Sequence, residues 1–463
     1  MDLFWHRRDL RTTDNRGLAE AATADPPLPV FVLDPAVLEH ASPPRIAFLL
    51  DALASLRARY DELGSDLLVA RGDPHERLPE LASSHGVDRV VWNADHSGLA
   101  RRRDDTVEAG LEAAGVEVEV SNDALLHEPG SVRTNAGDPY QVYTPFSTKW
   151  FDRPKDEPIP APEAVGAVES TSIPSLADLG VDAPVADLPA AGQGPARDRL
   201  DAFCEGPIVD YAEDRDYPAR EGTSRLSADL HFGTIGVRTV WAATEDALDR
   251  ARDEADRESN RAFQSQLAWR EFYAHVLHFN PETVTQNYLD FEHPIDWHED
   301  PEALAAWKAG ETGYPIVDAG MRQLREEAWM HNRVRMIVAS FLTKDLLVDW
   351  REGYRHFREH LVDHDTANDV GGWQWAASTG TDAQPYFRIF NPTTQGERYD
   401  PEAEYIQTYV PELRGVEPSM VHAWPELEPG ERDATAPDYP APIVDHTERR
   451  EAALETFEAA RGG

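Results

Sequence analysis

The chain has 463 residues, which is enough for two or three domains with buried cores. Its 85 Asp and Glu residues exceed its 44 Lys and Arg residues, so the formal net charge is −41. Hydrophobic residues make up 41% of the sequence, which excludes a disordered chain despite this charge. No run of about 18 apolar residues predicts a membrane span, and the first residues lack the apolar core of a signal peptide. A single cysteine, Cys204, excludes a disulfide framework, and we expect a monomeric cytoplasmic protein with no membrane partner.

Arginine carries nearly all of the positive charge, because the only lysines are Lys149, Lys155, Lys308 and Lys344. Abundant acid with scarce lysine is typical of halophilic proteins, although an acidic protein from an ordinary cell is the alternative. In molar salt the Debye length is roughly 3 Å, so the net charge would repel DNA only at short range. Any DNA site would then be a local, arginine-lined concavity.

In the first part of the chain, short apolar runs alternate with stretches of helical periodicity. This alternation predicts an α/β domain with a parallel sheet over residues 1–127. The predicted strands are Leu3–His6, Val30–Leu33, Leu67–Ala70, Arg89–Asn93 and Val116–Val120, and the predicted helices are Arg45–Leu63, Glu76–His85 and Arg102–Ala114. No glycine-rich dinucleotide fingerprint or P-loop follows a strand, but the carboxyl edge of the sheet can still bind a ligand.

The rest of the chain has a different character. Residues 151–195 are rich in Pro, Ala, Asp and Gly, and we predict an interdomain connector over 128–195. From residue 196 the strand-like runs vanish, so an all-helical domain is expected over 196–463. Its clearest amphipathic stretches are 261–278, 315–328, 332–349 and 444–460.

Two segments of the helical part combine polar groups in patterns that suit ligands. The small hydroxyl residues of 221–227 (EGTSRLS) precede a helix and offer donors to a phosphate, although the pattern taken alone favours an ordinary helix cap. Gln266, Trp269 and Arg270 share one face of a predicted helix. That face suits a planar ligand with an anion, and a helix–helix contact is the alternative.

Two further segments are less regular. Asn332 and Met336 lie one helical turn apart, where a methionine is usually core filler. In 363–375 the clustered acids and two glycines predict that no simple helix forms. Asp363 and Asp365 suit acid–base chemistry or metal binding, but no matching His or Glu set supports a metal, so none is expected. Trp373 and Trp375 are expected to point in different directions.

These segments resemble the photolyase/cryptochrome family, and within it the class I cyclobutane pyrimidine dimer (CPD) photolyases. The blocks that carry the resemblance are EGTSRLS, WREFY, GYPIVDAGMRQL, WMHNRVRM and GGWQWAASTGTDAQPYFRIFNP, with the opening WHRRDLRTTDN and the closing PAPIVDH. The resemblance implies the photolyase fold, with an antenna-chromophore domain over 1–127 and an FAD- and lesion-binding domain over 196–463. It implies light-driven repair of UV-damaged DNA, by electron transfer from excited reduced FAD to a flipped-out CPD.

The resemblance also implies a role for individual residues. Those expected to bind FAD are Tyr211, Thr223, Ser224, Leu226, Ser227, Arg270, Arg335, Asp363 and Asp365. Among them, Asp365 would bond the flavin ring and Asp363 would pair with Arg335. Those expected to contact the lesion or the DNA backbone are Arg215, Gln266, Trp269, Asn332, Arg333, Met336, Trp375 and Arg388. Trp373, Trp350 and Trp297 match an electron-transfer chain, although each alone suits a core tryptophan.

Four positions, at three places in the chain, depart from the family pattern. Asp369 replaces the asparagine that faces the flavin N5 in most photolyases, and we expect a neutral acid that donates to N5. Gln266 replaces a glutamate of CPD enzymes and is typical of (6-4) photolyases. Leu99 and Ala100 stand where folate-binding members carry Asn-Glu. An 8-hydroxy-deazaflavin antenna is therefore expected rather than methenyltetrahydrofolate, and an empty antenna site is the alternative.

Other functions remain open at this point. A cryptochrome-type blue-light photoreceptor without repair activity is the main alternative, because Asp369 resembles plant cryptochromes. A (6-4) photolyase is disfavoured, since Asn332 and Met336 stand where those enzymes carry a histidine pair. A plain flavoprotein oxidoreductase would lack a dinucleotide fingerprint, and a purely structural protein would leave the tryptophan and arginine cluster unexplained.

Overall fold

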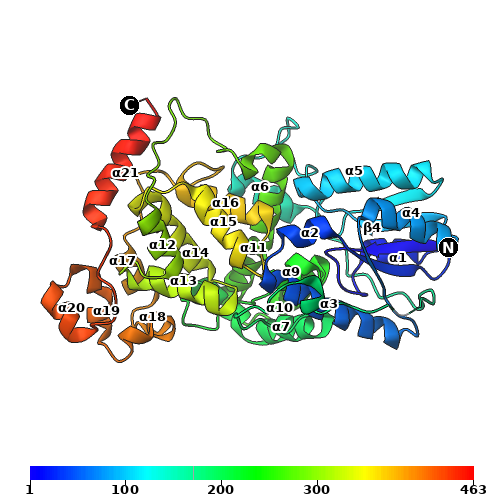
Figure 1. Ribbon diagram of the computed structural model, residues 1–463, viewed down its shortest axis with the longest axis horizontal. Coiled ribbons are helices and arrows are strands. Elements are labelled where there is room, and N and C mark those ends of the chain that lie inside the picture. The colour runs from blue at the N-terminus through cyan, green and yellow to red at the C-terminus, as the bar shows by residue number, and fades with distance from the viewer. Residues whose placement is uncertain (170, 463) are drawn as a thin grey trace.

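The computed structural model describes residues 1–169 and 171–462, which form a sheet-containing part and a helical part (Figure 1). Five strands make one all-parallel sheet in the order β3-β2-β1-β4-β5. The strands are β1 (Asp2–His6), β2 (Leu28–Leu33), β3 (Leu68–Arg71), β4 (Arg89–Asn93) and β5 (Glu117–Ser121). Every residue of β2 is buried, as expected for a parallel strand covered on both faces. The α/β prediction is confirmed, and each predicted strand overlaps an observed one.

The sheet has a topological switch point between β1 and β4. In register, Leu3 of β1 pairs with Leu28 of β2 on one side and with Val90 of β4 on the other. The connecting helices are α1 (Arg16–Ala21), α2 (Pro35–His40), α3 (Pro43–Glu62), α4 (Pro74–His85) and α5 (Gly98–Ala113). The connections leave β1 in opposite directions, so a crevice opens at the carboxyl ends of these strands.

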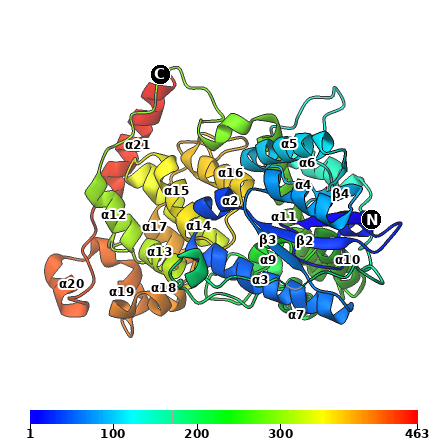
Figure 2. The same ribbon diagram turned by 45° about the vertical axis from the view of Figure 1, so that its right-hand side comes forward.

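Beyond β5 the described chain is helical or irregular, apart from an isolated bridge between Arg133 and Pro139. The longer helices are α6 (Tyr143–Asp152), α7 (Gln193–Glu205), α10 (Val237–Asp249), α11 (Glu254–Phe279), α12 (Pro301–Ala309), α13 (Pro315–Glu327), α14 (Asn332–Ser340), α15 (Trp350–His360), α16 (Thr366–Ala377), α17 (Pro392–Tyr399) and α21 (His446–Ala460). The shorter ones are η1 (Ala177–Leu179), η2 (Pro207–Val209), α8 (Tyr211–Asp214), α9 (Ser227–Phe232), η3 (Pro281–Val284), η4 (Phe341–Asp345), α18 (Glu404–Tyr409), η5 (Pro411–Leu413), α19 (Pro418–His422), η6 (Trp424–Glu426) and α20 (Pro429–Thr435). Figures 1 and 2 place the sheet at one end of the molecule and α19–α21 at the other.

The segment predicted as a connector, 128–195, contains α6 and the short η1. Between them the chain is mostly irregular, and apolar side chains such as Val165, Leu176 and Leu179 pack against the core beside the sheet. The division of the chain at residues 127 and 195 stays a prediction. None of the described helices is both long enough and apolar enough to cross a membrane.

The prediction that 363–375 forms no simple helix is wrong, because α16 runs without a break through both glycines. Asp365 is its N-cap and accepts a hydrogen bond from the Asn368 amide at 3.1 Å, where a negative charge also suits the helix dipole. Gly371 is required for packing: a Cβ there would lie 2.2 Å from the Tyr273 ring of α11. The acids and the glycine that suggested irregular chain thus start the helix and let it approach α11.

The helix predicted over 332–349 is also shorter than expected. The α-helix α14 ends at Ser340 and continues as one π-helical turn, η4. Leu347 then takes a left-handed backbone conformation, with φ of 54°, and remains fully buried. The side chain of Lys344 in this turn is buried and donates to the Ala377 carbonyl at 3.2 Å and to Ser378 Oγ at 3.0 Å.

A buried cluster of charges joins the two parts of the molecule. Arg238 of α10 donates from Nε to Asp14 Oδ1 at 2.6 Å and from Nη2 to Asp123 Oδ1 at 2.5 Å. Arg11 also donates to Asp123, and all four side chains are at most 3% exposed. Asp14 and Asp123 lie in loops beside the sheet, so this cluster fixes the helical part against it.

Candidate functional site

One face of α16 is open at Gly372. Asp365, Asp369 and Gly372 share this face, because they are spaced by four and three residues along the chain. A Cβ built on Gly372 would meet no heavy atom within 4 Å, in contrast to the tightly packed Gly371. The helix therefore presents two carboxylates beside a position that has open space within 4 Å.

Asp365 lies near two arginines from distant segments of the chain. Arg8 Nη2 donates to Asp365 Oδ2 at 3.1 Å, and Arg270 of α11 lies near enough to act on the same carboxyl. Burial alone would raise the pKa of Asp365, but Arg8 and Arg270 hold it well below its usual range. Arg270 itself donates to the carbonyls of Ala124 and Leu230. Sequence reasoning missed Arg8, although it stands in the opening block of the chain.

The ion pair that the resemblance implies between Arg335 and Asp363 is present. Arg335 Nη2 lies 3.1 Å and 2.8 Å from the two oxygens of Asp363, and Arg335 Nε donates to the Met330 carbonyl. Arg335 Nη1 lies 3.9 Å from Asp369 Oδ1. One guanidinium of α14 therefore contacts a carboxylate before α16 and another on its first turn.

Asp369 has a second partner, His364, which sequence reasoning also missed. His364 Nδ1 and Asp369 Oδ2 are 2.5 Å apart. The hypothesis of a neutral Asp369 stays a prediction.

The loop before α9 has hydroxyl groups that can still donate. Ser224 Oγ accepts from the Leu226 amide at 3.4 Å, and Ser227 Oγ accepts from Trp329 Nε1 at 3.3 Å. Each hydroxyl keeps its own proton for another acceptor. Arg225 between them has a left-handed backbone, with φ of 50°, a strained conformation typical of functional loops. Leu226 is buried and Thr223 half-buried in this loop, and burial raises the pKa of nearby Tyr211 to about 12.

An aromatic platform forms on α11. Trp269 stacks on Tyr143 of α6 with ring centroids 3.7 Å apart and planes 7° apart. The Tyr143 hydroxyl is fixed by Ser265, and Gln266 Nε2 donates to the Ala262 carbonyl at 3.2 Å. Sequence reasoning missed Tyr143, because nothing in its neighbourhood points to a residue more than a hundred positions away.

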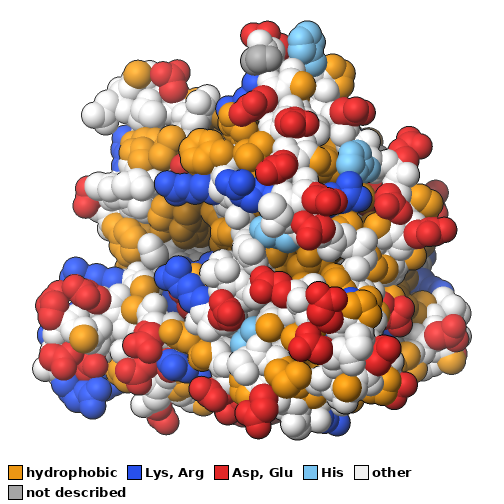
Figure 3. Space-filling view, turned by 90° about the vertical axis from the view of Figure 1, so that its left-hand side faces the viewer, with side chains coloured by type: hydrophobic (Ala, Val, Ile, Leu, Met, Phe, Trp, Pro, Cys, Tyr) orange, Lys and Arg blue, Asp and Glu red, His pale blue; other side chains and the backbone are white. Residues whose placement is uncertain are grey.

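The other residues expected at the lesion or DNA differ in their exposure and in their partners. Asn332 Nδ2 lies 3.9 Å from Met336 Sδ, so these two share a face as predicted. Arg333 donates to Asp216 at 2.6 Å and covers the Tyr399 ring, while Arg215 lies 4.0 Å from the same Asp216. Arg388 is exposed. On one face of the molecule, Figure 3 shows a recess with hydrophobic side chains on its floor and Lys or Arg side chains at its rim.

The three tryptophans of the predicted chain all pack in or against one core. Trp373 and Trp350 are buried in this core, and the half-buried Trp297 packs against the same core and has its ring centroid 5.9 Å from that of Phe457. Trp350 Nε1 donates to Asn287, whereas Trp373 Nε1 has no partner among residues 1–169 and 171–462. Trp375 is half-buried and lies near Phe390 instead, so Trp373 and Trp375 do face different surroundings.

A cavity of about 580 Å³ lies at the switch point of the sheet. Its walls come from the ends of β1, β2 and β4 and from the helical part, and they combine apolar with cationic groups. They include Trp5, Phe31, Leu38, Leu99, Ala100, Arg8, Arg45 and Arg103. This size and mixture suit a planar organic ligand with an acidic group.

Comparisons with known proteins define the class of this fold and site. Residues 2–163 match the DNA photolyase family, and residues 263–459 match the FAD binding domain of DNA photolyase. A bacterial class III photolyase from Agrobacterium tumefaciens superposes with a TM-score of 0.92 at 37% identity, over 100% of this chain and 98% of that one. The chain therefore belongs to the photolyase/cryptochrome family.

More narrowly, its relatives of similar length are deoxyribodipyrimidine photo-lyases. The one from Halobacterium salinarum is 60% identical over 100% of both chains, and the one from Synechococcus sp. is 42% identical over 97% of this chain and 94% of its own. An archaeal photolyase from Sulfolobus tokodaii, solved with two FAD molecules, superposes with a TM-score of 0.84 at 32% identity over 99% and 100%.

The chemistry of the site residues fits FAD. The open position at Gly372 leaves space beside α16 for a ring system. Asp365 provides an acceptor for a ring N–H, and Ser224 and Ser227 keep hydroxyl protons for a diphosphate. The Arg335–Asp363 pair supplies a fixed polar edge next to this space.

Proposed function

We propose that this protein binds FAD in the helical part and uses light to split cyclobutane pyrimidine dimers in DNA. The observation that carries the proposal is the 60% identity, over the whole of both chains, to a deoxyribodipyrimidine photo-lyase. The site chemistry supports it, because acceptors, hydroxyl donors and open space lie together on α16 and the loop before α9. The Asn332–Met336 contact favours CPD over (6-4) lesions, since neither side chain can act as the acid that (6-4) repair is thought to need.

When bound and reduced, FAD supplies the light-excited electron that splits the cyclobutane ring. The residues of this chain hold and orient the reactants. Asp365 accepts from the ring, Ser224 and Ser227 donate to the diphosphate with Thr223, Leu226 and Tyr211 around them, and Arg270 adds positive charge. The Arg335–Asp363 pair keeps the ring edge in place, and Asp369 lies one turn further along α16.

The dimer must leave the duplex to reach such a site, because a lesion inside the base stack cannot approach a buried cofactor. The Trp269–Tyr143 platform and the half-buried Trp375 offer apolar surfaces for the flipped lesion, and Gln266 offers an amide to its base edges. Arg388 is exposed and free to contact DNA phosphates, whereas Arg333 and Arg215 both lie near Asp216. Because Asp216 fixes the Arg333 guanidinium, Arg333 would contact the lesion from one position and would not follow the DNA phosphates. We propose that the protein acts as a monomer.

A repair assay tests this function. The protein is purified in molar salt, loaded with FAD, reduced without oxygen, and mixed with DNA that carries defined CPD or (6-4) lesions. The expected result is recovery of thymines from the CPD only, and only under blue light. A folded, FAD-loaded sample that repairs neither lesion would instead make the chain a cryptochrome-type photoreceptor, and repair of the (6-4) lesion alone would reassign the substrate.

The core tryptophans support a second part of the proposal, in which Trp373, Trp350 and Trp297 carry electrons from the surface to oxidised FAD. Trp350→Phe is expected to slow photoreduction of oxidised enzyme strongly, without changing repair by chemically reduced enzyme. Trp424→Phe is the control, since Trp424 is equally buried but donates to the Pro440 carbonyl in another part of the core. Equal photoreduction in both variants would remove the tryptophans from this role.

We also propose that the cavity at the switch point takes an antenna chromophore, with 8-hydroxy-deazaflavin as the expected ligand. Leu99 and Ala100 line this cavity and offer no polar group to a folate, whereas Arg45 and Arg103 suit an anionic ring. Mass spectrometry of the chromophores released from protein made in its natural host identifies the occupant. A folate would contradict the proposal, and so would a second FAD, as in the Sulfolobus relative.

A further inference from the structure

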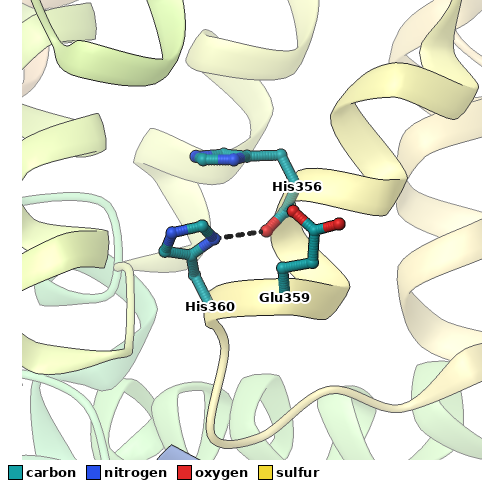
Figure 4. Close-up of side chains that lie close together, drawn as sticks. All are labelled: His356, Glu359 and His360. Carbon is teal, nitrogen blue, oxygen red and sulfur yellow. Dashed lines mark hydrogen bonds between the residues drawn. The ribbon is translucent and has the colours of Figure 1, made fainter. Parts of the chain in front are cut away.

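The last turns of α15 place three metal-binding side chains on one side of the helix. Glu359 and His360 follow His356 by three and four residues, so all three lie on one side of the helix. Figure 4 shows the two imidazole rings one above the other, with Glu359 beside them. One potential ligand atom from each residue lies within 4.8 Å of the other two. The ring centroids of the histidines are 4.1 Å apart. These residues are separate from the face of α16 that suits FAD.

His360 is already oriented as a ligand. Its Nδ1 lies 2.9 Å from the main-chain carbonyl of His356, which can only accept, so Nδ1 carries the proton (Figure 4). In a neutral ring, the lone pair is then on the Nε2 atom. Metal-binding histidines typically donate their second N–H to a carbonyl in this way, because the bond fixes the tautomer and the ring orientation.

His356 is held in place by packing. Its side chain is buried against Trp307, with ring centroids 5.6 Å apart. Glu359 adds the negative charge that two imidazoles lack, and it is exposed and free to rotate toward them.

We propose that His356, Glu359 and His360 form a binding site for a divalent transition-metal ion of the Zn²⁺ type. Two imidazole nitrogens and one carboxylate select Zn²⁺, Cu²⁺ or Ni²⁺ over Mg²⁺ and Ca²⁺, which prefer oxygen ligands. A tetrahedral ion with bonds of about 2.1 Å needs ligand atoms about 3.4 Å apart, so the three side chains would have to move closer than the 4.8 Å within which their ligand atoms lie. The set leaves a fourth position for water. The expectation of no metal came from segment 363–375 and did not consider this turn of α15.

Calorimetry on the FAD-loaded protein tests the site, with ZnCl₂ as the titrant. The wild type is expected to bind one Zn²⁺ per chain. His360→Gln is expected to weaken this binding by about 100-fold or more, because loss of a direct ligand costs at least as much as loss of its hydrogen-bond partner. Glu359→Gln, which keeps the shape and removes the charge, should weaken it less. His85→Gln is the matched control, since His85 is an exposed histidine in the last turn of α4.

Electron paramagnetic resonance with one equivalent of Cu²⁺ gives a second measurement. Two imidazole nitrogens should couple to the ion in the wild type and one in His360→Gln. Circular dichroism and FAD content show whether each variant is folded. The proposal would be overturned if the wild type bound no Zn²⁺, or if folded His360→Gln bound Zn²⁺ as tightly as the wild type. A Cu²⁺ spectrum of the wild type without coupled nitrogen would also overturn it.

Discussion

At the scale of single residues, Trp269 is the side chain whose removal should affect substrate binding most directly. Its ring stacks on Tyr143 and is half-buried, so the ring is held flat without help from a ligand. Stacking of a base on an aromatic side chain contributes about 1–3 kcal/mol, so Trp269→Ala should weaken binding of CPD-containing DNA roughly 5- to 150-fold. Filter-binding or anisotropy titrations measure this loss. Affinity for undamaged DNA should hardly change, and an equal loss for both DNAs would contradict a role at the lesion.

Asp369 gives a second prediction at this scale. Replacing it with Asn removes the carboxyl oxygen that lies 2.5 Å from His364 Nδ1. Asp369→Asn is therefore expected to change which redox and protonation state of the flavin accumulates during illumination, as read from its visible spectrum. The control is His364→Asn, which should shift the spectrum in the same direction if the two groups act together. Unchanged spectra and photoreduction rates in Asp369→Asn would show that the acid has no influence on the flavin.

Glu271 of α11 gives a prediction about pH. Its carboxylate is fully buried, accepts from Trp150 Nε1 at 2.6 Å and from the His127 amide at 3.2 Å, and has its pKa raised by burial to about 7. An acid whose pKa is raised on folding binds more protons in the folded state, so its contribution to stability is lost as pH rises from about 4.5 to about 7. Denaturant unfolding should show the stability of the wild type relative to Glu271→Gln declining over this range. A constant difference would mean that Glu271 does not titrate there.

Site residues were predictable where the family resemblance assigned them a role, and they were missed where only a contact in the fold reveals them. Arg335 and Asp363 were implied as a pair because both stand in sequence blocks that resemble a known family. Arg8, Tyr143 and His364 were missed because their partners lie on other elements, or because only the helical start at residue 366 brings them together. No local pattern records such contacts.

At the scale of elements, the two neighbouring glycines of α16 should behave differently. A Cβ at Gly371 would strike the Tyr273 ring, so Gly371→Ala should cost about 1–3 kcal/mol of folding free energy. Gly372→Ala meets open space, so it should stabilise the FAD-free protein by up to about 1 kcal/mol, because alanine favours a helix. The same change should weaken FAD binding, since the added methyl group occupies the open face. Thermal unfolding and FAD titration check both, and unchanged FAD affinity in Gly372→Ala would place the flavin elsewhere.

Elements were predictable wherever their own side chains decide the structure. The strands were found because parallel strands buried on both faces are continuous apolar runs. The segment 363–375 was misinterpreted because the need for Gly371 comes from Tyr273, on a helix about a hundred residues away. The end of α14 was missed because the π-helical turn depends on buried partners of Lys344 and not on local propensity.

At the scale of the whole molecule, the charge of −41 predicts a strong dependence of stability on salt. Acidic side chains repel one another across the surface, and the Debye length falls from about 10 Å at 0.1 M salt to about 3 Å at 1 M. The melting temperature should therefore rise steeply with KCl over this range and then level off. Sucrose at equal osmolality should give a much smaller rise, and a melting temperature independent of KCl would contradict this account of the charge.

The arrangement of the two parts was only half predictable. The change from strands to helices along the sequence indicated an α/β part and an all-helical part. The contact between them was not indicated, because Arg238 reaches Asp14 and Asp123 across more than a hundred residues. If one part slid on the other, these buried charges would lose their partners. An unpaired buried charge costs several kcal/mol, so such sliding is opposed, by about that much.

That buried cluster has a consequence for how light would be collected. The cavity at the sheet is lined from both parts of the molecule, and Arg8 both lines this cavity and pairs with Asp365 beside the open face of α16. Resonance energy transfer depends steeply on the separation and mutual orientation of two dyes. Because the buried charge cluster fixes the two parts against each other, the two chromophores would have the same separation and orientation in every molecule. A chromophore in the cavity would then transfer its excitation energy to the flavin with the same efficiency in every molecule, whether or not DNA is bound.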